Sequence, residues 1–150
     1  MIWWSFSRNS GRSGLFFLPS KNTTMNGERY INALEDHLLP MYAIHQCEIF
    51  MRDSAPCHKS KKVMKWLEEH DIRVLDWPGN SPDLNPIKNG LNIMKGKLNG
   101  CNTSSVPRLK EEIKKLWTSN MDHQYFKNLA ESMPRRLSDV VKAKWQMTKH

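Results

Sequence analysis

Apolar and polar positions at the start of the chain follow the pattern of a β-hairpin. Ile2-Trp-Trp-Ser-Phe-Ser7 has the composition of a strand, and Leu15-Phe-Phe-Leu18 is a second apolar run. Between them, residues 9–14 are rich in glycine, serine and asparagine, which is typical of a turn. We therefore expect a hairpin over residues 1–19.

The next part of the chain alternates helical and strand patterns. Apolar residues at helical spacing predict a helix that begins after Asn26 as N-cap and ends at Pro40. A short apolar run then ends at Asp53, which therefore lies at the carboxyl end of a predicted strand. In an α/β sheet, functional side chains usually lie at that end of the strands. Alternating elements favour an α/β fold. The expected elements are a helix over about 26–39, a strand over 47–53, a helix over 60–70 and a strand over 72–77.

Helices dominate the remainder of the chain. Pro78, Pro82 and Pro86 exclude regular structure from the block that contains them, because none of them has an amide donor. Asn85 is expected as the N-cap of the following helix, with Pro86 as its first residue. Apolar residues at helical spacing then predict helices through residues 86–146. With no linker or repeat between these elements, we expect one domain over residues 1–150.

Length and composition indicate one globular domain with one core. The chain has 150 residues, of which 39% are apolar and 25% charged. Its apolar runs fall far short of the roughly 18 residues of a membrane-spanning helix, and no signal-peptide pattern opens it. Cys47, Cys57 and Cys101 suit reduced thiols better than a disulfide scaffold. We expect a protein of the nucleus or cytoplasm that is not secreted and has no membrane partner.

Positive charge is concentrated towards the carboxyl end. The chain carries 23 Lys and Arg against 15 Asp and Glu, a net charge of +8. The net charge is 0 over residues 1–50, +3 over 51–100 and +5 over 101–150. Because basic side chains that neutralise phosphates release counterions, this excess favours a polyanion partner. Lysines that merely solubilise the surface are the other interpretation.

A series of short ordered blocks is the most specific feature of the sequence. They are Ile2-Trp-Trp-Ser-Phe-Ser7, Asp53-Ser-Ala-Pro-Cys-His58, Lys61-Lys-Val63, Trp66-Leu-Glu-Glu69, Val74-Leu-Asp-Trp-Pro78, Ser81-Pro-Asp-Leu-Asn-Pro-Ile87, Glu131-Ser-Met-Pro-Arg-Arg136 and Lys142-Ala-Lys144. In order and spacing they closely resemble the catalytic domain of the mariner superfamily of DNA transposases. Several ordered blocks are far more specific than any one short motif.

The resemblance implies an α/β, ribonuclease H-like fold of the DDE integrase and transposase type, with helices at its carboxyl end. The resemblance also implies an ancestral activity, which is DNA cleavage and strand transfer with two Mg²⁺ or Mn²⁺ ions held by three carboxylates. Asp53 matches the second acid. The third acid should follow the proline-rich block, and Lys88 occupies its position, with 34 residues between it and Asp53. Because a cation repels divalent ions, we expect no productive metal binding.

The resemblance also places the family's first aspartate on a strand upstream of residue 1. We therefore expect an N-terminally truncated domain that lacks its first, central strand, with unpaired edges and a split sheet. Asp53 without its partners is then a weak metal ligand at best. Lys88 also loses the capping and helix-dipole interactions of an acid at the third helical position after Asn85.

Two other chemistries are less well supported. His45, Cys47, Cys57 and His58 contain zinc-binding atoms, but their spacing matches no structural zinc pattern. Cys57 as a nucleophile with His58 as its base is also disfavoured, because adjacent residues rarely face one another. Reduced thiols remain the better interpretation.

Basic side chains in or near the blocks that carry the resemblance are the candidates for phosphate contacts. A solvated helix face explains any single one of them equally well. Trp66, Trp77, Trp117 and Trp145 fit a core better than a base-stacking surface. The candidate DNA-binding residues are Lys59, Lys61, Lys62, Lys65, Lys95, Lys97, Arg135, Arg136, Lys142 and Lys144.

These observations predict a transposon-derived, catalytically inactive transposase fragment, a relic or a domesticated remnant, that retains at most non-specific DNA binding. The alternative is a non-enzymatic fragment that docks with an intact transposase or another protein through an open sheet edge or its helices. A decayed gene with no stable product is a third interpretation. Salt dependence separates the first two, since phosphate contacts weaken steeply with salt.

Overall fold

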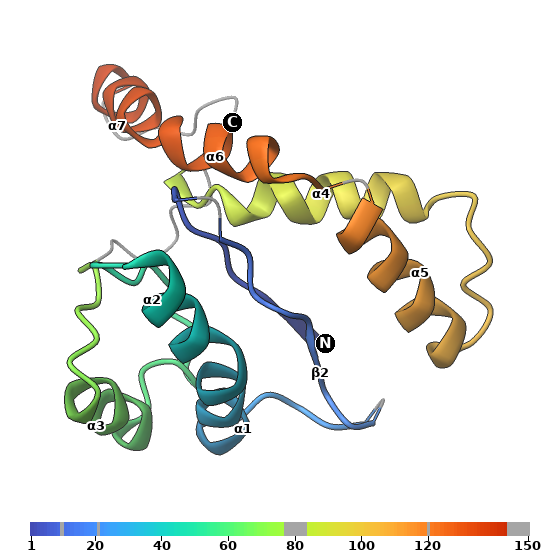
Figure 1. Ribbon diagram of the computed structural model, residues 1–150, viewed down its shortest axis with the longest axis horizontal. Helices are drawn as coiled ribbons and strands as arrows, with labels where there is room; N and C mark the ends of the chain where they lie inside the picture. Colours follow the sequence, from blue (N-terminus) through green and yellow to red (C-terminus); the bar gives the residue numbers. More distant parts are fainter. Residues whose placement is uncertain (10, 21, 77–83, 120, 144–150) are drawn as a thin grey trace. The chain divides into compact units, whose positions relative to one another are not determined.

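The computed structural model describes residues 1–9, 11–20, 22–76, 84–119 and 121–143 (Figure 1). The chain divides into two compact units, unit 1 (Met1–Asn80) and unit 2 (Ser81–His150). We expected a single core, whereas each unit buries apolar residues of its own. The boundary falls within the block whose prolines lack amide donors. No described helix has the length and apolar character needed to cross a bilayer.

Unit 1 opens with the predicted hairpin. Strands β1 (Ile2–Trp3) and β2 (Phe16–Phe17) pair antiparallel. Nearer the turn, Phe6 pairs with Arg12, a register shifted by one residue. The second arm therefore carries one extra residue, which is the signature of a β-bulge.

A continuous helical rod follows the hairpin (Figure 1). It consists of α1 (Gly27–Ala33), the π-helical segment η1 (Leu34–Leu38) and α2 (Leu39–His45). The Asn26 side chain caps α1, as predicted. The predicted end at Pro40 is wrong. Because η1 widens the turn before it, Pro40 lies in the first turn of α2, where a missing N–H is tolerated.

The second half of unit 1 forms a β-α-β arrangement. Helix α3 (Lys61–Glu69) begins after Ser60, as predicted. Of the two strands expected on either side of it, the described residues form one parallel bridge, between Phe50 and Val74. This bridge and the hairpin are separate pairings within the described residues. Trp77 lies outside the described residues.

The core of unit 1 lies between the helical rod, α3 and the bridged segments. On the rod, Tyr30, Leu34 and Leu38 recur at helical spacing on the buried face, whereas Ile31 is half-buried. Trp66 of α3 also donates its indole N–H to Glu35 Oε1 of η1 at 3.0 Å. The core residues are Tyr30, Leu34, Leu38, Met41, Phe50, Val63, Trp66, Leu67 and Ile72.

The described part of unit 2 is helical, as predicted. It contains α4 (Ile87–Leu98), α5 (Val106–Ser119), α6 (His123–Glu131) and α7 (Met133–Lys142). Helix α4 packs with α5, and α6 packs with α7. The last residues of the predicted helical region, 144–146, lie outside the described residues. Buried apolar residues of this unit are Leu84, Met94, Ile113, Leu116, Trp117, Met121, Phe126, Leu129 and Val140.

The start of α4 differs by one residue from the prediction. Pro86 is the N-cap rather than the first helical residue, because the helix begins at Ile87. Asn85 still contributes, since its side-chain oxygen accepts a hydrogen bond from the Ile87 N–H at 3.3 Å. Lys88 is consequently the second helical residue and not the third.

Candidate functional site

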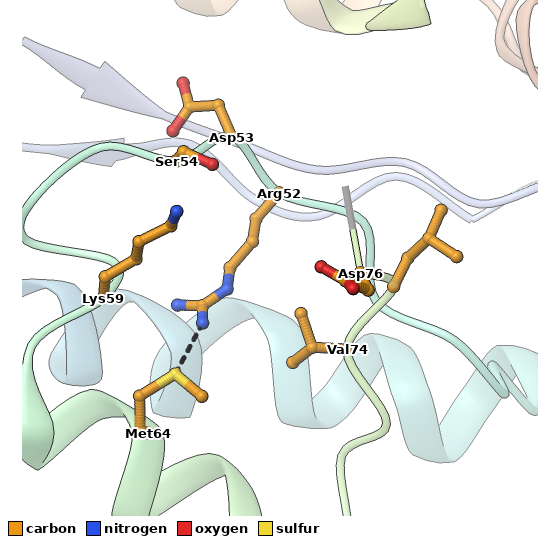
Figure 2. A pocket seen from close by; sticks show the side chains of 8 residues that line it. Arg52, Asp53, Ser54, Lys59, Met64, Val74 and Asp76 are labelled. Atoms are coloured by element: carbon orange, nitrogen blue, oxygen red, sulfur yellow. Dashed lines mark hydrogen bonds between the residues drawn. The ribbon is translucent and has the colours of Figure 1, made fainter. Parts of the chain in front are cut away.

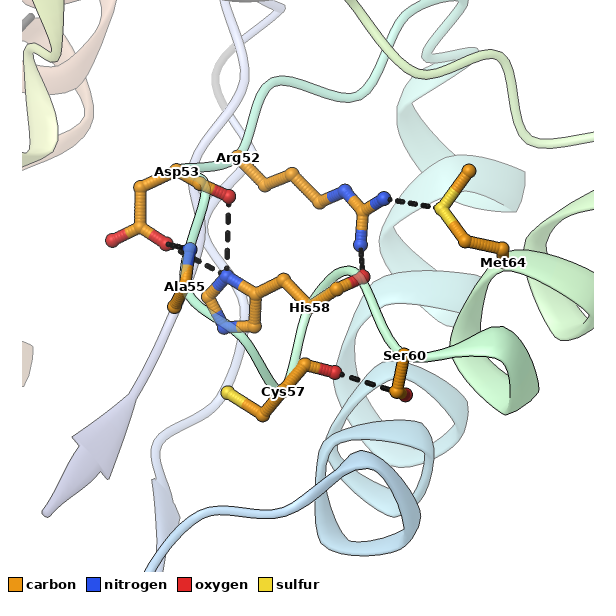
Figure 3. A network of polar contacts seen from close by, with 7 residues as sticks. All are labelled: Arg52, Asp53, Ala55, Cys57, His58, Ser60 and Met64. Atoms are coloured by element: carbon orange, nitrogen blue, oxygen red, sulfur yellow. Dashed lines mark hydrogen bonds and ion pairs between the residues drawn. The ribbon is translucent and has the colours of Figure 1, made fainter. Parts of the chain in front are cut away.

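Asp53 lies three residues beyond Phe50, at the carboxyl end of the bridged segment. Its side chain is 48% exposed. One carboxylate oxygen, Oδ1, accepts the Ala55 N–H at 3.1 Å and lies 2.7 Å from His58 Nδ1 (Figure 3). Asp53 is therefore engaged by its own loop.

His58 connects this loop to α1. Its side chain is only 15% exposed, and its ring stacks on Tyr30 with the ring centroids 4.0 Å apart. Burial lowers the pKa of His58, and the opposing effect of Asp53 is smaller. Because a carboxylate oxygen can only accept, the Nδ1–H of His58 donates to Asp53.

Arg52 holds the other side of the same loop. Its guanidinium donates to the carbonyl oxygen of His58 and contacts Met64 Sδ at 2.9 Å (Figure 3). The sequence reasoning missed this residue. A cation directly preceding Asp53 was the available signal, because Arg side chains satisfy carbonyl oxygens in loops that lack regular pairing.

A pocket opens beside Asp53 (Figure 2). Its charged residues are two cations, Arg52 and Lys59, and two carboxylates, Asp53 and Asp76. Asp76 follows the Val74 segment and therefore lies at the same end of the parallel pair as Asp53. The other lining residues are Ser54, Met64, Val74 and Leu75.

Lys88 occupies the start of α4 in unit 2. It is exposed, and the first turn of this helix contains no acidic residue. The amino end of a helix carries a partial positive charge, so a lysine there is unfavourable where an acid would be favourable.

Sequence comparison identifies the family to which this arrangement belongs. Residues 3–110 match the DDE superfamily endonuclease family. The chain belongs to this family. This DDE-family chain is 30% identical over 154 residues to the transposable element Tcb1 transposase of Caenorhabditis briggsae, covering 100% of this chain and 54% of that relative. It thus spans about half the length of the curated relatives it matches.

Solved structures support the same fold for the DDE-family chain. The Mos1 transposase catalytic domain with Raltegravir and Mn is 25% identical, with a TM-score of 0.79 over 99% of this chain and 82% of that chain. The Mos1 transposase paired-end complex with left transposon end is 24% identical, with a TM-score of 0.82 over 97% of this chain and 43% of that chain. The predicted ribonuclease H-like, mariner-type catalytic-domain fold is confirmed.

Among the described residues of unit 1, the surroundings of Asp53 do not supply the ligands that a pair of divalent ions needs. Hard cations require several anionic oxygen ligands. The Asp53 carboxylate is held by Ala55 and His58, and two cations line the pocket beside it. Within the described residues, no three His, Cys, Asp or Glu side chains come together in a way that could hold a metal.

Four predicted DNA-binding residues of the DDE-family chain lie just before α3 or in its first half, and all four are exposed: Lys59, Lys61, Lys62 and Lys65. One of them, Lys65, forms a 3.4 Å ion pair with Glu69. Also exposed, in unit 2, are Lys95, Lys97, Arg135 and Lys142. Lys144 lies outside the described residues.

Arg136 does not occupy the surface position that its prediction as a phosphate contact requires. It is only 4% exposed. Its guanidinium donates to Ser132 Oγ at 2.7 Å and to Asn89 Oδ1 at 3.0 Å. Arg136 therefore connects α7 to the first turn of α4 inside unit 2.

The remaining candidates are dispersed. His45 packs against Gly11, where a Cβ would lie 2.1 Å from the imidazole, whereas Cys47 lies against Met41 and His58 is in the Asp53 loop. The structure therefore does not bring the zinc candidates together. Trp66 and Trp117 are buried, as predicted, and Trp77 and Trp145 lie outside the described residues.

Proposed function

We propose that this DDE-family chain is a transposon-derived, catalytically inactive transposase fragment that binds DNA without sequence preference. The observation that carries the proposal is Lys88, a cation at the position of the family's third acid. Two-metal phosphoryl transfer depends on carboxylates that hold both ions. A lysine at one of these positions removes a ligand and adds a repulsive charge.

Unit 1 supplies the supporting argument for inactivity. One carboxylate oxygen of Asp53 accepts a hydrogen bond from the Ala55 N–H and contacts His58 Nδ1, and the adjoining pocket contains Arg52 and Lys59. Positive charges in the pocket already balance the negative ones, so the pocket attracts divalent cations weakly. The Mos1 transposase catalytic domain is described with Mn and with Mg, and we propose that neither ion is bound productively here.

DNA binding is supported by charge and exposure. The net charge of +8 and the exposed lysines at the start of α3 give the electrostatic attraction that non-specific DNA binding requires. A solved relative is described as a paired-end complex with a transposon end. We propose the nucleus or the cytoplasm as the compartment of this chain.

The test uses the purified 150-residue chain with duplex DNA. We expect no strand cleavage in Mg²⁺ or Mn²⁺, together with binding by fluorescence anisotropy whose log K falls steeply with log salt. Cleavage that Asp53→Ala abolishes would contradict the inactivity. Absence of binding at low salt would contradict the DNA-binding role.

A second function is docking with an intact transposase or another protein. Leu137 and Val141 favour it, because they lie four residues apart on α7 and are 46% and 59% exposed. Binding to a partner through this apolar surface would depend little on salt. Pull-down of an intact transposase that survives high salt and is lost in Val141→Asp would support docking over DNA binding.

A further inference from the structure

The loop from Asp53 to Ser60 leads directly into the basic start of α3. Lys59 belongs to this loop, and Lys61 and Lys62 are the first residues of the helix. Any contact that fixes the loop therefore also fixes the backbone positions from which these lysine side chains extend. This matters for DNA binding, because phosphate contacts require several cations in a definite arrangement.

Two contacts fasten the loop to α1. The His58 ring lies on Tyr30, which is fully buried in the core of unit 1. Two residues further on, Ser60 lies so close to Gly27 that a Cβ at position 27 would stand 2.5 Å from Ser60 Oγ. A Cβ at position 27 would displace the Ser60 hydroxyl, so the start of α3 lies against the start of α1.

Asp53 orients the first of these contacts. Its Oδ1 accepts from His58 Nδ1 at 2.7 Å while also accepting the Ala55 N–H at 3.1 Å (Figure 3). The imidazole thus has one edge held by a carboxylate and one face held by Tyr30. We refer to Asp53, His58 and Tyr30 together as the loop clasp.

We propose that the loop clasp positions the lysines at the start of α3 for DNA, so that Asp53 supports nucleic-acid binding although it is itself an anion. The inference rests on the proposed DNA binding and makes Asp53 and His58 positioning residues. It predicts that removing the Asp53 side chain lowers DNA affinity, which is the opposite of what simple electrostatics predicts. Removing a carboxylate beside a phosphate-binding surface ordinarily raises DNA affinity, because a repulsive charge is lost.

The experiment compares two substitutions of Asp53 in the full chain. Asp53→Asn removes the charge but keeps an oxygen acceptor for His58, whereas Asp53→Ala removes both. We expect Asp53→Asn to raise the affinity for a labelled 20-base-pair duplex about twofold at low salt. Asp53→Ala should instead lower the affinity about fivefold and reduce the slope of log K against log salt by about 1, because fewer phosphates are contacted together.

A second pair of variants separates the two contacts of His58. His58→Phe keeps a ring to stack on Tyr30 but loses the donor, and His58→Asn keeps a donor but loses the ring. Both should lower affinity, and combining His58→Phe with Asp53→Ala should lower it no further than either change alone. Glu68→Ala is the matched control, because Glu68 is an exposed carboxylate at the far end of α3. This control should raise affinity slightly.

The outcomes distinguish the inference from the proposed function. If the unsubstituted chain fails to bind the duplex, the proposed function fails. If the chain binds and Asp53→Ala raises affinity as Glu68→Ala does, the loop clasp has no positioning role and only the inference is overturned. Circular dichroism checks that each variant is folded, and should Asp53→Ala unfold, His58→Phe against Asp53→Asn gives the same comparison.

Discussion

The two residues that we propose to occupy acid positions of the family lie in contrasting surroundings. In unit 1, Asp53 lies within a set of local contacts with Ala55 and His58. In unit 2, Lys88 lies on an exposed helical turn. An acid that also organises its loop is costly to replace, because its contacts are lost with its charge. An acid whose neighbourhood is solvent can change with a much smaller effect on folding.

The largest expected effect tests the buried end of the loop clasp. Tyr30 is fully buried, and its hydroxyl has no hydrogen-bond partner among the described residues. Tyr30→Ala should destabilise unit 1 by about 3–5 kcal/mol, because it leaves a cavity and removes the surface on which His58 stacks. Urea unfolding followed by circular dichroism measures the change.

Tyr30→Phe is the matched control for this substitution. It keeps the ring and removes only the buried hydroxyl, so it should be neutral or stabilise by about 1 kcal/mol. A loss of stability in Tyr30→Phe comparable to that in Tyr30→Ala would show that the hydroxyl, and not the ring, holds the loop.

A smaller effect is expected for the buried arginine of unit 2. Arg136→Ala removes hydrogen bonds to Ser132 and Asn89 and should destabilise the chain by about 2–3 kcal/mol. The neighbouring Arg135 is exposed, so Arg135→Ala should change stability by less than about 0.5 kcal/mol. DNA affinity should respond in the opposite order, and weaker binding in Arg136→Ala without loss of stability would place Arg136 on the surface after all.

Acidification should weaken unit 1. The His37 ring lies against Trp3 and Phe16 of the hairpin, and burial lowers the pKa of His37, while Asp36 acts weakly in the opposite direction. The unfolded chain, in which the histidine pKa is about 6.5, therefore binds the proton more readily than the folded chain. Stability is fully present above about pH 6.5 and decreases as the pH falls below it. The measurement is amide hydrogen exchange in the hairpin and η1 at about pH 7 and pH 5, corrected for intrinsic exchange, with His37→Phe showing the smaller change.

Local sequence signals predicted most elements of the fold. Asn26 begins a helix because its side chain caps the Arg29 N–H, whereas Ser60 stands at the predicted N-cap position with its hydroxyl bonded to the Cys57 carbonyl oxygen. The apolar spacing of the sequence does not predict the π-helical segment η1, which precedes Pro40 in the helical rod. A widened turn changes that spacing by less than one residue. The hairpin bulge could not be predicted from the apolar spacing either. It depends on contacts between the two arms, such as the hydrogen bond from the Ser5 N–H to Ser13 Oγ, which form only once the arms have paired.

The sequence names candidate residues for the site but not its geometry. Asp53 and Lys88 stay predictions from their blocks, whereas the Asp53–His58 contact depends on how the four residues between them fold. Arg135 and Arg136 look equivalent as neighbouring cations in the sequence. Only packing shows that one is exposed and the other is 4% exposed, because a helical turn places adjacent side chains on different faces.

The smallest expected effect tests Lys88 as a helix residue rather than as a lost ligand. Lys88→Glu places an acid in the first turn of α4, where it complements the partial positive charge, and should stabilise unit 2 by about 0.3–1 kcal/mol. Lys95→Glu, in the last turn of the same helix, makes the same charge change at the opposite end and should destabilise by a similar amount. Thermal unfolding of both variants at low salt gives the comparison. Equal shifts of the unfolding temperature with the same sign would mean that net charge, and not the position of Lys88 at the start of the helix, sets its effect on stability. Restored Mn²⁺-dependent DNA cleavage in Lys88→Glu would mean that this single lysine is what makes the chain inactive.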